Sequence, residues 1–159
     1  MASVLEYLQG RGQVFTVIPH GQSIGPDGEV HVVGVPSEIA VRTVVVMANE
    51  GPAVLVIPAS RELDLELLPE ALGDPSARPA SEWELEGQFP EYEVGALPPL
   101  SMLLLAPMYV DPAVIDRTEI VFAAGRQDLS IRMSTRDLFG SDPLVITPLT
   151  AESRVAAPA

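Results

Sequence analysis

Few residues in this 159-residue chain could carry out chemistry. The chain has no cysteine, which excludes disulfides, thiolate metal sites and cysteine nucleophiles. Its only histidines are His20 and His31, so a histidine-rich metal site is not available, although carboxylates could still bind a hard cation. All nine basic residues are arginines. We therefore expect no metal and no cofactor.

Two segments could hold a catalytic group, and both have an ordinary alternative. Residues 21–25, Gly-Gln-Ser-Ile-Gly, match the nucleophile elbow of serine hydrolases, which needs a strand-to-helix turn and a later acid and histidine. A proline, an aspartate and a glycine follow at once, so we interpret the segment as a turn. His20 could be a general base, but no paired acid is in view and a solvated turn histidine is the favoured interpretation.

A loop near residue 95 is the most informative segment. Gly95 lets a ligand or another backbone approach closely, and Pro98 and Pro99 stiffen the residues that follow. The loop could form a rigid pocket rim with backbone donors, or it could be a structural turn, and composition leaves both open. The ten acidic residues between positions 62 and 93 indicate a solvated face and not a metal site, because calcium-loop spacing is absent.

The net charge of −13 opposes broad electrostatic binding of nucleic acid. Any RNA contact must therefore be local or be supplied partly by a partner, and we expect no DNA binding. No apolar run approaches the roughly 20 residues that a membrane helix needs. The N-terminus also lacks the basic-then-apolar order of a signal peptide. We expect a cytoplasmic protein with no membrane partner.

The apolar pattern predicts an α/β (α+β) fold, with a mixed β-sheet or partly closed barrel and short peripheral helices. Strands are expected at 14–18, 42–47, 53–57, 102–110, 119–123 and 129–133, with the clearest hairpin around residues 49–52. Helices are expected at 3–9, 36–41, 63–72, 81–88 and 135–139. Residues 1–140 form the expected domain, and residues 141–159 form a partly flexible extension whose last dozen residues fray.

An ordered set of short motifs resembles the YbaK/prolyl-tRNA-synthetase-associated domain family. Residues 89–99, FPEYEVGALPP, resemble its GxxxP-containing loop. Further matching pieces are 19–20, 34–36, 42–46, 107–111, 119–122, Gly125, 131–133 and 137–139. The similarity runs from about Val14 to Phe139, most of the chain. It implies a YbaK-like mixed sheet or barrel with helices around it, and hydrolysis of the ester that joins a wrong amino acid to tRNA.

The resemblance also implies site residues. Family members carry a lysine that helps to hold the aminoacyl group, and Arg42 stands in its place, so we expect Arg42 to be the catalytic residue. The GxxxP loop lines the family pocket and offers backbone hydrogen bonds. The substrate-binding residues expected here are His20, Gly95, Ala96, Leu97, Pro98, Pro99 and Gly125. A hydroxyl of the terminal ribose can assist the attack, so no protein nucleophile is required.

Three departures from the family pattern surround this implied pocket. The guanidinium of Arg42 is larger and flatter than an ammonium. Leu100-Ser101 replaces the usual Phe-Gly, and Ala123 stands where asparagine is common. Two functions remain open: an aminoacyl-tRNA deacylase whose partners are the acceptor end and possibly an aminoacyl-tRNA synthetase, or a non-catalytic member that binds a small ligand or a protein. For the first, we expect one pocket between Arg42 and the 95–99 loop.

Overall fold

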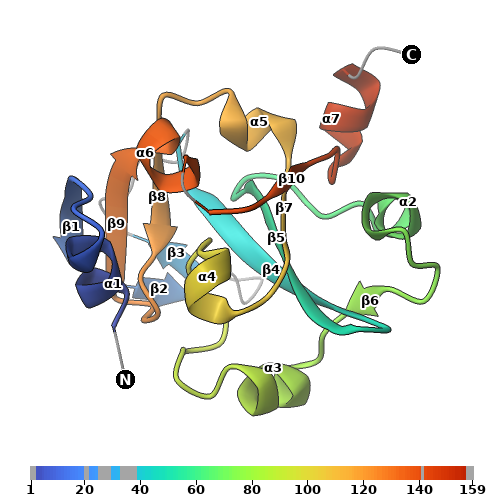
Figure 1. Cartoon of the computed structure of the whole chain (residues 1–159), viewed down its shortest axis with the longest axis horizontal. Coiled ribbons are helices and arrows are strands. Elements are labelled where there is room, and N and C mark those ends of the chain that lie inside the picture. The colour runs from blue at the N-terminus through green and yellow to red at the C-terminus, as the bar shows by residue number, and fades with distance from the viewer. Residues whose placement is uncertain (1–2, 20–21, 25–29, 33–38, 141, 157–159) are drawn as a thin grey trace.

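The computed structural model describes residues 3–19, 22–24, 30–32, 39–140 and 142–156. A five-stranded sheet forms the centre of the fold, in the order β10-β7-β5-β4-β6 (Figure 1). Its strands are β4 (Val41–Ala48), β5 (Gly51–Pro58), β6 (Arg78–Pro79), β7 (Met108–Val110) and β10 (Val145–Ile146). The β4–β5 hairpin is antiparallel, whereas β7 runs parallel to both β5 and β10. The predicted mixed sheet and the predicted hairpin are confirmed.

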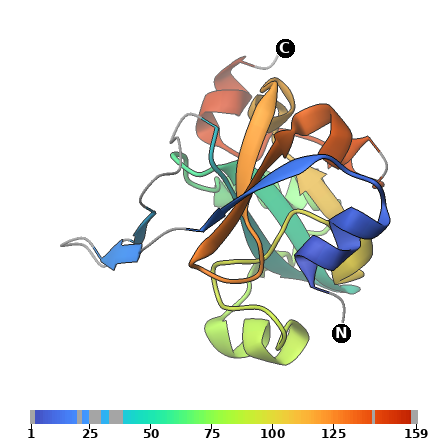
Figure 2. The same cartoon turned by 90° about the vertical axis from the view of Figure 1, so that its left-hand side faces the viewer.

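A second, antiparallel sheet covers one face of the first. It contains β1 (Phe15–Pro19), β9 (Leu129–Ser134) and β8 (Glu119–Ala123), in that order. A short antiparallel pair, β2 (Gln22–Ile24) and β3 (Val30–Val32), extends away from the body (Figure 2). Ser23 pairs with His31 inside this ladder, so residues 22–24 form a strand and not the expected turn. A strand interior is also not the strand-to-helix turn that a nucleophile elbow requires.

The two faces of the five-stranded sheet bury different clusters, because successive side chains of a strand point to opposite faces. An inner cluster lies between the two sheets and includes Val41, Val45, Val54, Val56, Leu97, Leu100, Phe122 and Ile131. An outer cluster lies on the opposite face and includes Val46, Leu55, Ile57, Leu68 and Leu149. Both faces are therefore covered, which explains the nearly unbroken apolar runs of β4 and β5.

Short helices surround the sheets. They are α1 (Val4–Gly10), the 3-10 turn η1 (Leu65–Leu67), α2 (Leu68–Leu72), α3 (Glu82–Gln88), α4 (Ser101–Leu104), α5 (Pro112–Ile115), α6 (Thr135–Phe139) and α7 (Ala151–Ala156). Of these, α1, η1, α3, α5 and α6 begin at a serine or aspartate whose side chain accepts from a backbone amide of the first turn. Ser81 and Glu84 form a reciprocal capping box at the start of α3, as the sequence predicts. No helix among the described residues is long and apolar enough to span a membrane.

The expected strand at 102–110 is wrong in its first half. Residues 101–104 form α4, and only Met108–Val110 form a strand. Leu105 ends the helix in the left-handed conformation, with a φ of 55°. Pro107 cannot donate a sheet hydrogen bond, which delays the strand to Met108. The short elements α5 and β6 were not expected. The predicted helix at 36–41 is wrong where the structure describes it, because Ile39 lies in a turn, Ala40 forms an isolated bridge with Val121 and Val41 begins β4; residues 36–38 lie outside the described residues.

The C-terminal extension packs against the body of the protein. β10 adds to the edge of β7, and Leu149 and Thr150 are fully buried. The expectation that the last dozen residues fray is therefore wrong for residues 149–154, which hydrogen bonds to Asp111 and Arg61 hold in place. The domain boundary at residue 140 stays a prediction.

Candidate functional site

Arg42 lies near the start of β4 and belongs to the outer face of the sheet. Its cross-strand partner is Ile57, a member of the outer cluster. Its Nη2 donates to the carbonyl of Arg61 at 2.9 Å and to the carboxylate of Glu62 at 3.2 Å. Its Nε is shielded from solvent and has no hydrogen-bond partner within the described part of the chain. The Arg42 side chain is 40% exposed, so a ligand can reach it.

Two further arginines lie close to Arg42. Arg61 donates from Nη1 to the hydroxyls of Thr150 and Ser153, at 3.3 and 3.1 Å. Arg117 donates from Nη1 to the carbonyl of Ala40, at 3.0 Å. Burial lowers the pKa of Arg117, and the neighbouring charge of Arg61 lowers it further. The charge of Asp111 acts in the opposite direction, and arginine remains charged in such surroundings, so Arg117 is a partly buried cation that lies near both Arg61 and Asp111.

A buried carboxylate orders the residues around Arg61. Asp111 caps α5 by accepting from the amide of Ala113 at 2.9 Å. It also accepts from the amides of Leu149 and Thr150 and from the hydroxyls of Thr150 and Ser153. The same two hydroxyls accept from Arg61, so a chain of hydrogen bonds runs from Asp111 to Arg61. Sequence reasoning missed this group, although the Asp-Pro pair at 111–112 is a typical helix start.

Backbone hydrogen bonds join the 95–99 loop and its flank to Gly125. The amide of Gly125 donates to the carbonyl of Ala96 at 2.8 Å, and the amide of Glu93 donates to the carbonyl of Gly125 at 3.0 Å. Gln127 closes the loop further by donating to the carbonyl of Val94 at 2.6 Å. Within the loop only Gly95 is exposed, and residues 96–99 are buried.

The expected pocket between Arg42 and this loop is wrong. Leu97 packs in the inner cluster, together with Val41 and Val45 of β4. Because side chains alternate along a strand, Thr43 shares that face and Arg42 points to the other one. The five-stranded sheet therefore separates the Arg42 guanidinium from the loop. His20, the remaining expected site residue, lies outside the described residues.

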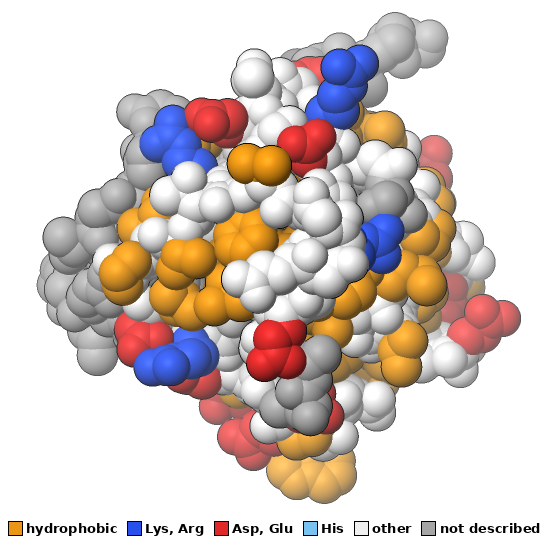
Figure 3. All heavy atoms as spheres, turned by 60° about the vertical axis from the view of Figure 1, so that its left-hand side comes forward, with side chains coloured by type: hydrophobic (Ala, Val, Ile, Leu, Met, Phe, Trp, Pro, Cys, Tyr) orange, Lys and Arg blue, Asp and Glu red, His pale blue; other side chains and the backbone are white. Residues whose placement is uncertain are grey.

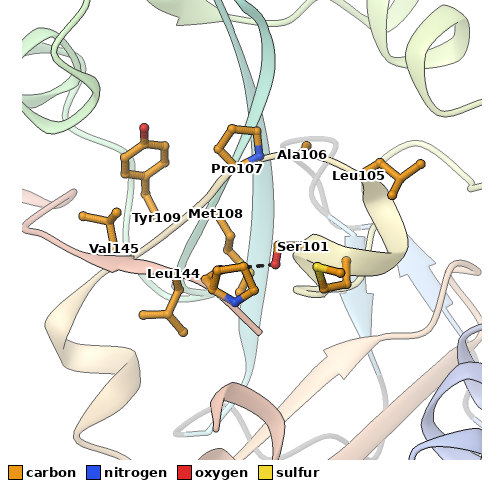
Figure 4. A pocket seen from close by; sticks show the side chains of 10 residues that line it. Ser101, Leu105, Ala106, Pro107, Met108, Tyr109, Leu144 and Val145 are labelled. Atoms are coloured by element: carbon orange, nitrogen blue, oxygen red, sulfur yellow. Dashed lines mark hydrogen bonds between the residues drawn. The ribbon is translucent and has the colours of Figure 1, made fainter. Parts of the chain in front are cut away.

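An apolar groove lies beside α4, which begins two residues after the 95–99 loop. It has a volume of about 390 Å³ and is lined by Ser101, Met102, Leu105, Ala106, Pro107, Met108, Tyr109, Pro143, Leu144 and Val145 (Figure 4). The hydroxyl of Ser101 donates to the carbonyl of Pro143 at 3.2 Å, which ties α4 to the C-terminal extension. The groove offers apolar contact and few polar groups, so its chemistry suits binding more than catalysis.

The aminoacyl-tRNA editing domain family matches this sequence over residues 29–140. The match covers more than half of the chain and includes Arg42, the 95–99 loop and Gly125. This chain belongs to the aminoacyl-tRNA editing domain family. The family expected from the sequence motifs is thereby confirmed, and so is the predicted class of function, aminoacyl-tRNA editing.

Solved structures share the fold of this editing domain. A hypothetical protein, APE2540, is 23% identical with a TM-score of 0.77, over 92% of this chain and 98% of that chain. A protein described as a candidate trans-editing enzyme for prolyl tRNA synthetase is 18% identical with a TM-score of 0.73, over 94% and 98%. A scaffold protein used for grafting linear epitopes is 20% identical with a TM-score of 0.76, over 92% and 93%. No curated protein matches the sequence.

Proposed function

We propose that this editing domain hydrolyses the ester bond between a mischarged amino acid and the 3′ end of its tRNA. In this reaction water adds to the ester carbonyl, the bond to the ribose oxygen breaks, and a free amino acid and an uncharged tRNA leave. The family match over residues 29–140 carries the proposal. The substrate, charged tRNA, makes the cytoplasm the compartment that we propose.

Arg42 is the residue to which we assign substrate orientation. Its guanidinium is partly exposed, and its carboxylate partner, Glu62, is 95% exposed. Exposed ion pairs of this kind contribute only about 0–1 kcal/mol, so a substrate group can displace Glu62 from Arg42. The hydrogen bond to the Arg61 carbonyl, at 2.9 Å, meanwhile holds the guanidinium in place. A held cation can orient a carbonyl and stabilise the oxyanion that forms on it.

The buried part of the 95–99 loop takes an indirect role in this proposal. Ala96 and Leu97 are 0% and 4% exposed, and their neighbours are the inner cluster and Gly125. We assign them to bracing the sheet from the inside. Gly95 is exposed and is the loop residue that remains free to meet a ligand.

The test is deacylation of a panel of mischarged tRNAs by the wild type, Arg42→Ala and Arg42→Lys. We expect Arg42→Ala to lose activity with little change in thermal stability. Arg42→Lys restores the family's residue, and it keeps or raises activity if the site needs only a compact cation. If the site grips a carboxylate-like group with the planar fork, Arg42→Lys loses about 1.5–3 kcal/mol of binding.

Arg126→Ala is the matched control, because Arg126 is an exposed arginine that pairs with Asp128 at 2.8 Å in a separate turn. Equal activity of wild type, Arg42→Ala and Arg42→Lys would remove Arg42 from the mechanism. The same assays run with an aminoacyl-tRNA synthetase present test whether that enzyme is the protein partner, as we propose.

A non-catalytic binding module is the second candidate function. The observation that favours it is the apolar groove beside α4, which holds about 390 Å³ and has few polar groups. Deacylation by the wild type on any member of the panel rules this candidate out as the sole function. Binding of aminoacyl-tRNA without hydrolysis, across the whole panel, would support it.

A further inference from the structure

Positive charge is scarce in this protein and is unevenly distributed. The chain has nine arginines against 22 acidic residues. Most described arginines away from β4 have a carboxylate of their own, as in the pairs Arg78–Glu84 and Arg132–Glu119, at 2.7 and 2.8 Å. On the face drawn in Figure 3, basic side chains likewise lie mostly beside acidic ones. Because each of these arginines is paired with a carboxylate, little positive electrostatic potential remains there to attract an anion.

Arg42, Arg61 and Arg117 differ from these pairs in the carboxylates around them: those of Arg42 and Arg61 are exposed, and Arg117 has none within ion-pair distance among the described residues. Short contacts to backbone carbonyls place all three at one end of the five-stranded sheet. The carbonyl of Arg61 accepts from Arg42 at 2.9 Å. The carbonyl of Ala40 accepts from Arg117 at 3.0 Å, and it also accepts from the amide of Ala59 at 2.9 Å. Ala59 lies two residues before Arg61, so all three arginines lie where β5 ends and β4 begins.

The negative charges near this cluster leave it open to an incoming anion. Asp111 is fully buried, and its oxygens already accept from two hydroxyls and three backbone amides. Glu62 and Glu152 contact Arg42 and Arg61 at 3.2 and 3.6 Å, and their side chains are 95% and 56% exposed. No carboxylate lies within ion-pair distance of Arg117 among residues that the structure describes.

We propose that Arg61 and Arg117, beside Arg42, bind a phosphodiester group of the tRNA acceptor end. The inference rests on the proposed function, since it places the RNA next to the residue that orients the ester. Guanidinium groups match the geometry of phosphate oxygens and are always charged. Such a site supplies the local RNA contact that a chain of net charge −13 requires.

The C-terminal extension positions one half of this site. Thr150 and Ser153 accept from Arg61, and both hydroxyls in turn donate to Asp111. The direction of Arg61 is therefore set by residues that follow the 29–140 family match. The orientation of the Arg117 side chain is set independently, by its hydrogen bond to the Ala40 carbonyl.

The experiment compares two substrates that differ in phosphate. One is a mischarged tRNA, and the other is the same amino acid on adenosine, which has the ester but no phosphate. For Arg61→Gln and Arg117→Gln, we expect the preference for the tRNA, measured as the ratio of the two KM values, to fall about tenfold. We also expect the slope of log Kd for uncharged tRNA against log salt to fall by about one for each arginine removed.

Three further measurements keep the result decisive. Arg126→Gln is the matched control and keeps the wild-type ratio and slope. Arg117→Lys retains the charge, so it recovers part of the preference if Arg117→Gln is poorly folded in a thermal melt. A wild type that hydrolyses neither substrate counts against the proposed function, and the salt slope for uncharged tRNA then tests the phosphate site alone. An unchanged slope, or KM values that rise equally for both substrates, would overturn the inference.

Discussion

Thr150 donates two hydrogen bonds to the buried carboxylate of Asp111, one from its amide at 3.2 Å and one from its hydroxyl at 3.1 Å. The carboxylate also accepts from Ala113, at the start of α5. One side chain therefore joins the β7–α5 turn to the C-terminal extension. In Figure 1 these elements lie at one end of the molecule, with α7 beside α5.

Asp111→Ala removes the acceptor for all of these donors and leaves them buried without partners. We expect the free energy of unfolding to fall by about 3–5 kcal/mol, measured by urea denaturation. Asp116→Ala is the control, because Asp116 is an exposed residue at the other end of α5, and it changes stability by less than about 0.5 kcal/mol. Equal stability of the two variants would contradict the structural role of Asp111.

Gly125→Ala should destabilise the fold through both backbone and packing. Gly125 has a φ of 89°, which a side chain disfavours, and an added Cβ would lie 3.1 Å from Cδ1 of Tyr92. We expect a loss of about 1–3 kcal/mol in thermal or urea unfolding. Gly10→Ala is the matched control, because Gly10 is helical and has nothing within 4 Å of an added Cβ. A Gly125→Ala protein as stable as Gly10→Ala would show that the backbone and packing at position 125 do not require glycine.

Acid should loosen α3 through Glu84. Hydrogen bonds from Arg78 hold the pKa of Glu84 at about 2, below its ordinary value of 4.5. Since the folded state lowers this pKa, the stabilisation is complete above pH 4.5 and is lost as the pH falls toward 2. Trp83, the only tryptophan, lies in α3 and reports the change by fluorescence. We expect this acid transition to disappear in Glu84→Gln. The control Glu86→Gln changes an exposed glutamate of the same helix and should keep the transition. Identical plots of fluorescence against pH for wild type and both variants would show that Glu84 does not cause the transition.

Glu62 competes with the substrate for Arg42 if Arg42 orients the ester. We expect Glu62→Gln to lower the KM for mischarged tRNA by a few-fold, because an exposed ion pair of about 0–1 kcal/mol no longer has to break. Glu66→Gln is the control, since Glu66 is also a highly exposed glutamate and contacts Arg154 instead. A higher KM for Glu62→Gln would mean that Glu62 helps to position Arg42.

Removal of divalent metal should leave deacylation unchanged. The chain has no cysteine and two histidines, and no group of three or more potential ligands lies together among the described residues. The measurement is the deacylation rate before and after treatment with a chelator. A rate that the chelator abolishes and added metal restores would show that the prediction is wrong.

Local signals in the sequence were sufficient to predict an element wherever residues close together in the chain decide its structure. Ser81 and Glu84 define the start of α3 because their two capping bonds span only three residues. The β4–β5 hairpin follows from two β-branched runs on either side of a short turn. The motifs around Arg42 and Gly95 also predicted the family. These inferences needed no knowledge of what packs against each segment.

Tertiary contacts decided the features that the sequence left open. The Leu-rich run at 102–105 suits a buried strand or a helix, and packing against the C-terminal extension selects α4. The extension itself is held by bonds between Asp111 and residues up to 42 positions away, which no local pattern announces.

For a related reason, the sequence did not determine on which face of the five-stranded sheet Arg42 lies. β4 is apolar on both sides, so its alternation does not say which side meets the 95–99 loop. The sequence by itself determined the locally specified elements, such as α3 and the β4–β5 hairpin, together with the family and the identity of the candidate cation. The tertiary structure alone decided that Arg42 faces Arg61 and the outer cluster, because the side of a doubly covered strand is set by what packs on each face.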